Sequence, residues 1–203
     1  MKRLLALFVL IVASAAAHAE APVILVFGDS ISAGYGLAPE QGWVELLKTR
    51  LKSQGYGYQV VNASVSGETT AGGLARLPRA LELHHPSIVI LELGGNDGLR
   101  ALPTAQMRAN LTQMANLSSA AGAKVLLLGM RMPPNYGPEY TQQFAMVFSD
   151  LAAEKKLPLV PFLLTGIALS PALLQGDDIH PNAQGQPILL ENVWPILNPL
   201  LHK

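Results

Sequence analysis

A serine follows a short apolar run near the start of the chain, in the stretch VILVFGDSIS at residues 23–32. A serine hydroxyl is a poor nucleophile at neutral pH unless a base takes its proton and a third group orients that base. The late stretch GDDIHPN offers both groups, because His180 follows Asp177 by three residues. We therefore predict Ser30 as nucleophile, His180 as base and Asp177 as the orienting carboxylate. Asp178 is a rival for the orienting role.

Attack on a carbonyl also requires hydrogen-bond donors for the negative charge that develops on its oxygen. Two further polar stretches follow apolar runs, NASVSG at residues 62–67 and GGND at residues 94–97. Gly67 can offer a backbone N–H with no side chain in the way. Asn96 can offer its carboxamide. Together with the N–H of Ser30, these groups form a predicted oxyanion hole.

Each of these stretches also has an ordinary structural explanation. The GDS sequence is typical of a strand-to-helix turn in which Asp29 or Ser30 caps the helix. GGND is equally typical of a turn without chemistry, and the D-x-x-H spacing is a weak signal alone. The catalytic interpretation is favoured because the first three stretches follow apolar runs and the fourth can reach the same sheet edge from the C-terminal end of the chain. Four independent coincidences at one edge are improbable.

Five apolar runs rich in Val, Ile and Leu alternate with helical patterns along the chain. The runs are residues 23–27, 58–63, 87–93, 123–129 and 157–162. Such runs are typical of strands that are covered on both faces. The alternation predicts an α/β fold, with a parallel sheet between two layers of helices. Right-handed crossovers then bring the polar stretches to the carboxyl edge of the sheet.

Four local features are also predicted. Pro78 should kink or break the helix around residues 69–83. Thr104 should be the N-cap of the next helix, and Pro181 should occupy the first position of a helix. His84 and His85 precede Pro86 at a strand entrance, so we expect exposed imidazoles at a helix end, on the edge away from the site.

Composition excludes several classes of function. The 203-residue chain has no cysteine, which rules out a thiol nucleophile and a zinc-thiolate site. Its formal net charge is zero and it has no basic block, so nucleic acid is not an expected partner. The histidines do not form an H-E-x-x-H pattern, and we expect neither a metal nor a cofactor. Residues 20–203 are expected to form one domain.

The first nineteen residues have the layout of a secretory signal peptide. Lys2 and Arg3 precede an apolar run, and small residues end at Ala19, so cleavage is expected before Glu20. An uncleaved membrane anchor is the alternative, but the apolar run is short for a bilayer span and rich in Ala. No later stretch is long and apolar enough to cross a membrane. We therefore expect a periplasmic protein without a membrane span.

The stretches FGDSIS, NASVSG, GGND and DDIHPN resemble, in order and spacing, the four sequence blocks of the GDSL-type SGNH hydrolases. The resemblance covers residues 22–195, with Ile31 standing where the name has Leu. It implies a three-layer α/β/α, flavodoxin-like fold with a five-stranded parallel sheet, and the same triad and oxyanion hole. Within the family, the sequence is most similar to periplasmic bacterial esterases that act on thioesters, aryl esters and lysophospholipids. The G-x-S-x-G elbow of the larger α/β-hydrolase group is absent.

The substrate site is expected between the loops at residues 97–103 and 131–140, which leave the carboxyl edge. Their apolar side chains would form a groove for an acyl chain, and Arg100 could meet a phosphate, although the same residues could merely pack on the core. The expected substrate-binding residues are Leu99, Arg100, Leu102, Pro133, Pro134 and Tyr136. We therefore expect a monomeric serine ester hydrolase that acts on a small-molecule or lipid ester. A carbohydrate acetyl esterase and a non-catalytic binding module remain the alternatives.

Overall fold

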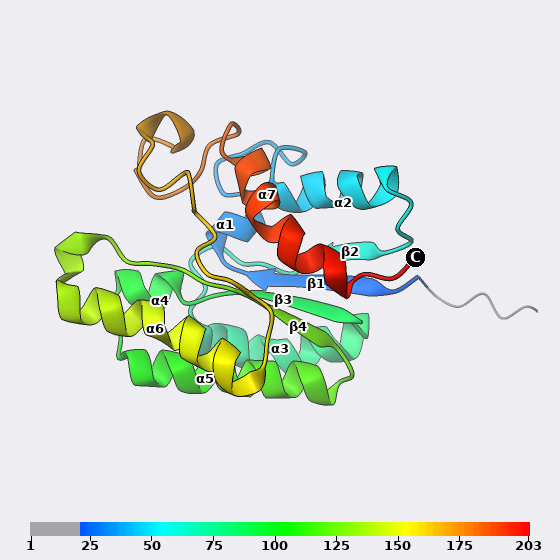
Figure 1. Ribbon diagram of the computed structural model, residues 1–203, viewed down its shortest axis with the longest axis horizontal. Coiled ribbons are helices and arrows are strands. Elements are labelled where there is room, and N and C mark those ends of the chain that lie inside the picture. Colours follow the sequence, from blue (N-terminus) through cyan, green and yellow to red (C-terminus); the bar gives the residue numbers. More distant parts are fainter. Residues whose placement is uncertain (1–20) are drawn as a thin grey trace, which may run out of the picture.

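A computed structural model describes residues 21–203, and its centre is one parallel sheet with the strand order β2-β1-β3-β4-β5 (Figure 1). The strands are β1 (Val23–Gly28), β2 (Gln59–Asn62), β3 (Ile88–Glu92), β4 (Lys124–Leu128) and β5 (Leu159–Val160). The five predicted strands and the α/β fold class are thus confirmed. β5 is shorter than expected because prolines flank it, and a proline has no N–H to donate to a neighbouring strand.

Helices cover both faces of the sheet and complete the three layers. α2 and α7 lie over one face, and α3, α5 and α6 lie over the other (Figure 1). The helices are α1 (Ser30–Ala33), α2 (Trp43–Ser53), α3 (Thr70–His84), α4 (Gly95–Leu99), α5 (Thr104–Ala120), α6 (Pro138–Lys155) and α7 (Gln186–Leu197), with short 3-10 helices at Pro134–Tyr136, Pro171–Leu173 and Asn198–Leu200. Every residue of β3 is buried, as expected for a strand that helices cover on both faces.

The helices that flank the sheet bury the apolar stripes visible in the sequence. In α2, Trp43, Leu47 and Leu51 recur at i, i+4 and i+8, and all three are buried in the core. In α5, Met107 and Leu111 lie one turn apart and are buried in the same way. Burying a side chain of this size stabilises the fold by about 1.5–3 kcal/mol, so these stripes hold the helices against the sheet.

Three local predictions differ from the structure. Pro78 was expected to kink or break its helix, and it does not break it, because α3 runs continuously from Thr70 to His84. Pro78 lies on the exposed face of α3, while Leu77 and Leu81 are buried and hold the helix on the sheet on both sides of it. Thr104 is the first residue of α5 and not its cap, a position that Pro103 occupies.

The third difference concerns Pro181, which does not begin a helix. It pairs with Leu174 in an isolated antiparallel bridge, and α7 begins only at Gln186. The chain around His180 is therefore an irregular loop. Its conformation depends on hydrogen bonds made within the loop and to neighbouring segments, rather than on a helix.

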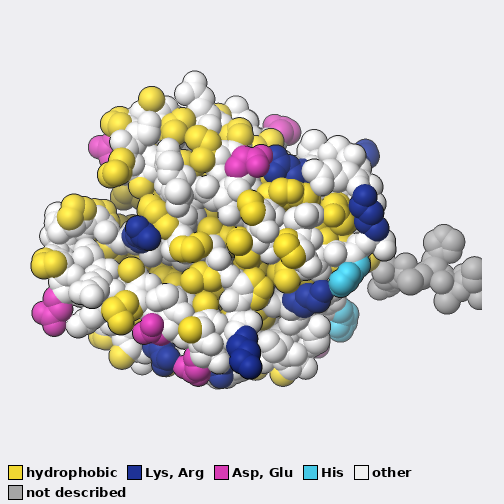
Figure 2. Space-filling model, in the orientation of Figure 1, with side chains coloured by type: hydrophobic (Ala, Val, Ile, Leu, Met, Phe, Trp, Pro, Cys, Tyr) yellow, Lys and Arg dark blue, Asp and Glu magenta, His cyan; other side chains and the backbone are white. Residues whose placement is uncertain are grey.

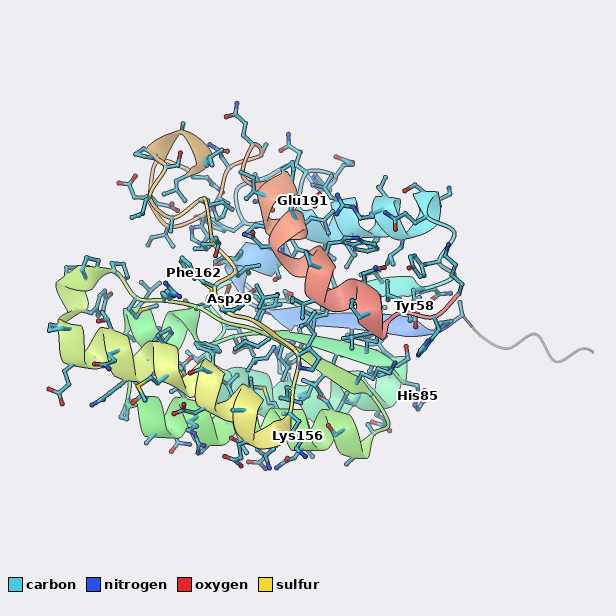
Figure 3. The ribbon with its side chains drawn as sticks, viewed as in Figure 1. Asp29, Tyr58, His85, Lys156, Phe162 and Glu191 are labelled. Atoms are coloured by element: carbon cyan, nitrogen blue, oxygen red, sulfur yellow. The ribbon has the colours of Figure 1, made fainter. Side chains whose placement is uncertain are left out.

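The topology explains where the site must lie. β1 sits between β2 and β3, so the chain leaves β1 toward one edge of the sheet and later returns to the other side of β1. This reversal makes a crevice at the carboxyl ends of the strands, where ligands bind in such folds. His85, exposed at the end of α3, lies at the opposite end of the sheet from Asp29, as predicted (Figure 3), whereas His84 beside it is half-buried and not exposed as expected.

Within residues 21–203, no helix combines the length and the apolar character that crossing a bilayer requires. The predicted signal peptide lies outside the described residues.

We expect Pro78→Ala to raise the free energy of unfolding. A proline inside a helix costs about 3 kcal/mol relative to alanine, while its loss gives the unfolded chain about 1 kcal/mol of extra conformational entropy. The net gain should be about 2 kcal/mol, measured by urea denaturation, with Pro138→Ala at the first position of α6 as a control that gains nothing. A destabilised Pro78→Ala variant would show that the proline is required for the path of α3.

Candidate active site

Ser30 stands at a sharp junction between β1 and the short helix α1. β1 ends at Gly28, where a Cβ would come within 2.5 Å of Glu92 Oε2, so no larger residue fits. Asp29 caps α1, and its Oδ1 accepts a hydrogen bond from the Ile31 N–H at 3.1 Å. The capping interpretation of this stretch is therefore correct. It is also compatible with chemistry, because the cap places Ser30 at the first position of α1 with its side chain in the cleft.

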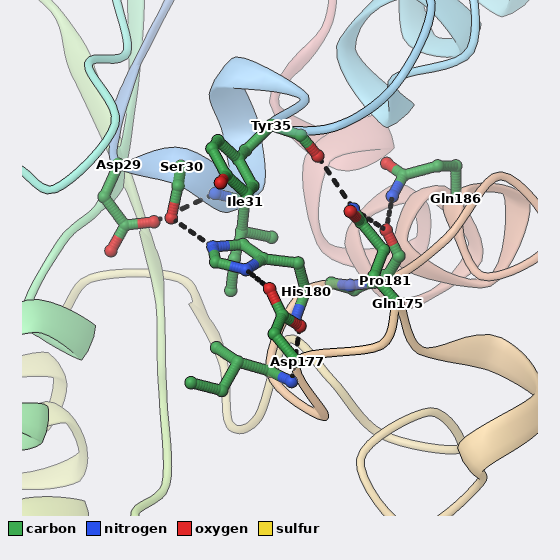
Figure 4. A network of polar contacts seen from close by, with 10 residues as sticks. Asp29, Ser30, Ile31, Tyr35, Gln175, Asp177, His180, Pro181 and Gln186 are labelled. Atoms are coloured by element: carbon green, nitrogen blue, oxygen red, sulfur yellow. Dashed lines mark hydrogen bonds and ion pairs between the residues drawn. The ribbon is translucent and has the colours of Figure 1, made fainter.

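The structure brings Ser30, His180 and Asp177 into one hydrogen-bonded line (Figure 4). Ser30 Oγ lies 2.8 Å from His180 Nε2, although the two residues are 150 positions apart. On the other side of the ring, His180 Nδ1 lies 2.6 Å from Asp177 Oδ2. Asp178, the rival carboxylate, has a left-handed backbone with φ 57°. Its side chain makes no hydrogen bond to the imidazole, so Asp177 is the residue in position to orient the ring.

Asp177 remains ionised at neutral and moderately acidic pH. Partial burial opposes its charge, but the backbone N–H groups of His180 and Ile179, each 3.0 Å from Oδ1, and the His180 ring outweigh this effect. Together they lower the pKa of Asp177 to about 2. A carboxylate that accepts these bonds is fixed in direction, and it favours the His180 tautomer with a proton on Nδ1. Nε2 is then free to accept the Ser30 proton.

Three hydrogen-bond donors from different segments line the same cleft as the Ser30 hydroxyl. They are the N–H of Ser30, the N–H of Gly67 and the carboxamide of Asn96. Gly67 has φ 78°, a left-handed conformation that favours glycine. Within residues 21–203, neither backbone N–H is used in another hydrogen bond. These donors are thus available to a bound oxygen, which is the requirement for an oxyanion hole.

Other residues hold these donors in place through hydrogen bonds that could not be read from the sequence. Arg100, expected to contact substrate, donates a hydrogen bond to the Gly67 carbonyl at 3.1 Å. Buried Asp97 accepts hydrogen bonds from the Thr70 backbone N–H at 2.8 Å and from the Thr70 hydroxyl at 2.5 Å. These contacts join α4, which carries Asn96, to the segment between Gly67 and α3.

Two buried carboxylic acids lie directly behind the site. Asp29 is 2% exposed and Glu92 is fully buried, and the Asp29 N–H donates to Glu92 Oε2 at 3.2 Å. Burial raises the pKa of Asp29 to about 6, although bonds from Ile31 and Asn96 and the nearby His180 partly oppose the rise. Burial, aided by the charge of Asp29, raises the pKa of Glu92 well above its usual range. The lone acid in the apolar run SIVILEL was the only sequence signal for this pair.

Asp29 also determines how Asn96 is oriented. Its Oδ2 accepts a hydrogen bond from Asn96 Nδ2 at 3.1 Å. An amide nitrogen carries two N–H groups, so one bond to Asp29 leaves the second free. Asp29 therefore fixes the direction of the Asn96 carboxamide. The group that remains free is the second N–H of Nδ2, which is a hydrogen-bond donor.

The cleft beside Ser30 has a volume of about 480 Å³ and is lined mostly by apolar side chains. Figure 2 shows hydrophobic side chains on both sides of a hollow at this end of the molecule. Of the expected substrate residues, Leu99, Pro133 and Pro134 line the cleft, whereas Arg100, Leu102 and Tyr136 do not. Sequence reasoning missed the lining residues Met130, Met132, Phe162, Leu164, Ala168, Leu169, Leu174 and Ile179.

Tyr136 has a different contact from the one expected. Its hydroxyl donates to the Leu99 carbonyl at 3.0 Å, and Tyr140 does the same to the Leu102 carbonyl at 2.9 Å. The two tyrosine hydroxyls thus stabilise the loop that contains Leu99 and Leu102 and borders the cleft. Within the described part of the chain, no group of three or more acidic, histidine or cysteine side chains is placed to hold a metal ion.

Comparison with known proteins shows the family of this chain. Residues 26–188 match the model of the GDSL-like Lipase/Acylhydrolase family. The chain belongs to this family. It is 55% identical over 184 residues to Esterase TesA of Pseudomonas aeruginosa, covering 91% of this chain and 92% of the relative. It is 41% identical over 184 residues to Thioesterase 1/protease 1/lysophospholipase L1 of Escherichia coli, covering 91% and 87%.

The GDSL family fold is also found among solved structures. A crystal structure of TesA superposes with a TM-score of 0.86 at 56% sequence identity, covering 88% of this chain and 99% of that one. The five-stranded arrangement implied by the resemblance to GDSL-type SGNH hydrolases is therefore confirmed.

The buried acid at position 29 predicts an unusual dependence of stability on pH. The native state keeps the Asp29 proton up to about pH 6, whereas the unfolded chain releases it near 3.8. This group therefore lowers the free energy of unfolding as the pH rises between these values, by about 3 kcal/mol. The difference between the free energies of unfolding of wild type and Asp29→Asn should change by that amount between pH 3 and pH 7. If the free energies of unfolding of the two proteins changed equally with pH, the inference that buried Asp29 keeps its proton up to about pH 6 would be wrong.

Proposed function

We propose that this protein is a serine ester hydrolase that cleaves carboxylic esters and thioesters through an acyl-enzyme on Ser30. The observation that carries the proposal is the hydrogen-bonded line from Asp177 through His180 to Ser30, which ends in a cleft with three free donors. A nucleophile, an oriented base and an oxyanion hole are the parts that acyl transfer requires.

In the first half of the reaction, Ser30 Oγ attacks the carbonyl carbon while His180 Nε2 takes the hydroxyl proton. The carbonyl oxygen becomes an anion and accepts hydrogen bonds from the Ser30 N–H, the Gly67 N–H and Asn96. Each such donor contributes about a hundredfold or more to the rate. The intermediate then collapses, and the alcohol or thiol leaves with the proton from Nε2.

In the second half, water attacks the acyl carbon and gives its proton to His180 Nε2. The carboxylic acid leaves, and the proton returns to Ser30 Oγ, which restores the enzyme. The imidazole is positively charged at both intermediate stages. Asp177, which stays ionised because its pKa is about 2, stabilises that charge without accepting the proton.

The lining of the cleft favours an acyl chain as the part of the substrate that is bound. Apolar side chains from several segments surround it, including Leu99, Met132, Phe162 and Leu164. A pocket of this size and character suits an aliphatic chain. The relatives named esterase and thioesterase/lysophospholipase support the same substrate class.

The expected location of the protein narrows the choice of its natural substrate among these esters. The Lys2-Arg3 start and the Ala17-His18-Ala19 end of the first nineteen residues support export to the periplasm. Acyl-CoA is a cytoplasmic compound, so lysophospholipids and small carboxylic esters are better natural substrates for an exported enzyme.

A carbohydrate acetyl esterase has less support. That activity would require exposed aromatic rings beside the site to stack on sugars. Tyr136 and Tyr140 are not part of the cleft lining, and their hydroxyls bind backbone carbonyls. Tyr35 does line the cleft, but its ring packs against His180.

Hydrolysis of p-nitrophenyl esters of graded chain length, by wild type and Ser30→Ala, tests the proposal. Loss of the nucleophile should reduce kcat by at least about a thousandfold, while circular dichroism and thermal unfolding stay unchanged. Ser149→Ala, on the outer surface of α6, is the matched control and should retain full activity. Equal rates for wild type and Ser30→Ala would leave only the fold assignment standing.

Parallel substitutions of Asp177 and Asp178 show which of the two carboxylates orients His180. Asp177→Asn should lower kcat by about 10⁴-fold, because the amide favours the wrong histidine tautomer. Asp178→Asn should change it little, since that side chain makes no hydrogen bond to the ring. Both rates are measured with the ester that wild type cleaves best, and the reverse order of effects would assign the orienting role to Asp178.

A further inference from the structure

The loop that carries Asp177 and His180 is closed on itself. Residues 174–182, here called the acid–base loop, are joined at their base by the bridge between Leu174 and Pro181. The Gln175 N–H donates to the His180 carbonyl at 2.7 Å. The bond between Asp177 and His180 also lies entirely within this loop. The loop therefore fixes the geometry of its own two side chains, but not their position relative to Ser30.

Few contacts connect the acid–base loop to residues 29–36, the segment that carries the nucleophile. Among the described residues, one hydrogen bond joins the two besides the Ser30–His180 contact itself. In it, Gln175 Nε2 donates to the Tyr35 carbonyl at 2.8 Å (Figure 4). The Tyr35 ring packs on the His180 ring with 4.7 Å between centroids.

The neighbouring glycine makes this contact possible. Gly36 has φ 74°, and a Cβ there would collide with the Gln175 side-chain carboxamide. The nucleophile segment thus accepts the Gln175 carboxamide at a position where any other residue would exclude it.

A second glutamine secures the other side of the acid–base loop. Gln186, in α7, is 1% exposed, and its Nε2 donates to the Pro181 carbonyl at 3.1 Å. Gln175 Nε2 reaches the same carbonyl at 3.2 Å. The Gln186 Oε1 accepts the Trp43 N–H at 3.0 Å. The carbonyl of Pro181, the residue after His180, is thereby linked through Gln175 to the nucleophile segment and through Gln186 to the start of α2.

We propose that Gln175 is a positioning residue that sets the distance between His180 and Ser30. The proposal rests on the proposed function and adds to it the contact on which proton transfer depends. Gln175 does not line the cleft, so it acts through His180 and not on the substrate. A displacement of about 1 Å at a reacting group can reduce the rate about a hundredfold, and the Gln175–Tyr35 bond is placed to prevent such a displacement.

The first test compares the ester hydrolysis of wild type with that of Gln175→Met, which keeps the size of the side chain and removes its donors. We expect kcat/KM for the p-nitrophenyl ester to fall about 10- to 100-fold. The inhibition constant of the product fatty acid, which reports on the cleft, should not change. Gln143→Met is the matched control, because Gln143 is exposed on α6 and its amide binds only Glu139. It should keep the wild-type rate.

Ring ¹⁵N spectra of histidine-labelled protein separate positioning from loss of structure. In Gln175→Met, the His180 Nε2 signal should shift because its contact with Ser30 is loosened. The Nδ1 signal should stay as in wild type, since Asp177 is in the same loop. This readout does not depend on turnover, so it tests the proposal even if wild type proves inactive on esters.

The outcomes are distinct. A folded Gln175→Met with an unchanged rate and an unchanged Nε2 signal overturns the proposal. Loss of both ring signals together overturns it too, because Gln175 would then only hold the loop folded. If Gln175→Met does not fold, Gln175→Glu, which has the same shape and lacks the donors, replaces it with the same criteria. If wild type shows no Ser30-dependent hydrolysis, the proposed function fails independently of the ring signals.

Discussion

The contact between the ends of β1 and β3 is the constraint on which the site depends. Gly28 pairs with Glu92 in the sheet, and the Asp29 N–H donates to the buried Glu92 carboxyl group. From that position Asp29 caps α1, which presents Ser30, and accepts the hydrogen bond that orients Asn96. One buried side chain therefore relates the proposed nucleophile to a proposed oxyanion donor in α4. The buried residues of β1 and β3 beneath them make this relation rigid.

This arrangement has an energetic cost that the core must offset. Burying a carboxylic acid disfavours its charged form, and here two acids lie side by side with raised pKa values. Glu92 Oε1 has no hydrogen-bond partner among the described residues, and such a group costs about 1–3 kcal/mol. The two acids hold Ser30 and Asn96 in place at this cost, which is a trade of stability for the proposed activity.

The sequence predicts well the features that depend on local pattern and poorly those that depend on distant contacts. The strands are predictable because runs such as SIVILEL are long and apolar, and the parallel sheet then brings Ser30, Gly67 and Asn96 to one edge. α3 continues through Pro78 because packing of Leu77 and Leu81 on the sheet outweighs the local propensity of proline. Arg100 and Tyr136 lie in the loops that were expected to bind substrate. Their partners are backbone carbonyls, which no residue pattern reveals.

Different interactions hold the two halves of the candidate site. Core packing holds Ser30 and Asn96, and hydrogen bonds hold the loop with His180. Ser30 and Asn96 follow buried strands, so their positions are determined by the packing of the whole core. His180 lies in an irregular loop beyond the short β5, and a few polar contacts through Gln175 and Gln186 connect it to the rest. Packing involves many atoms and tolerates the loss of one, whereas a loop held by so few bonds does not. The alignment of base and nucleophile should therefore be more easily lost than the fold, and substitutions far from the substrate can act at this point.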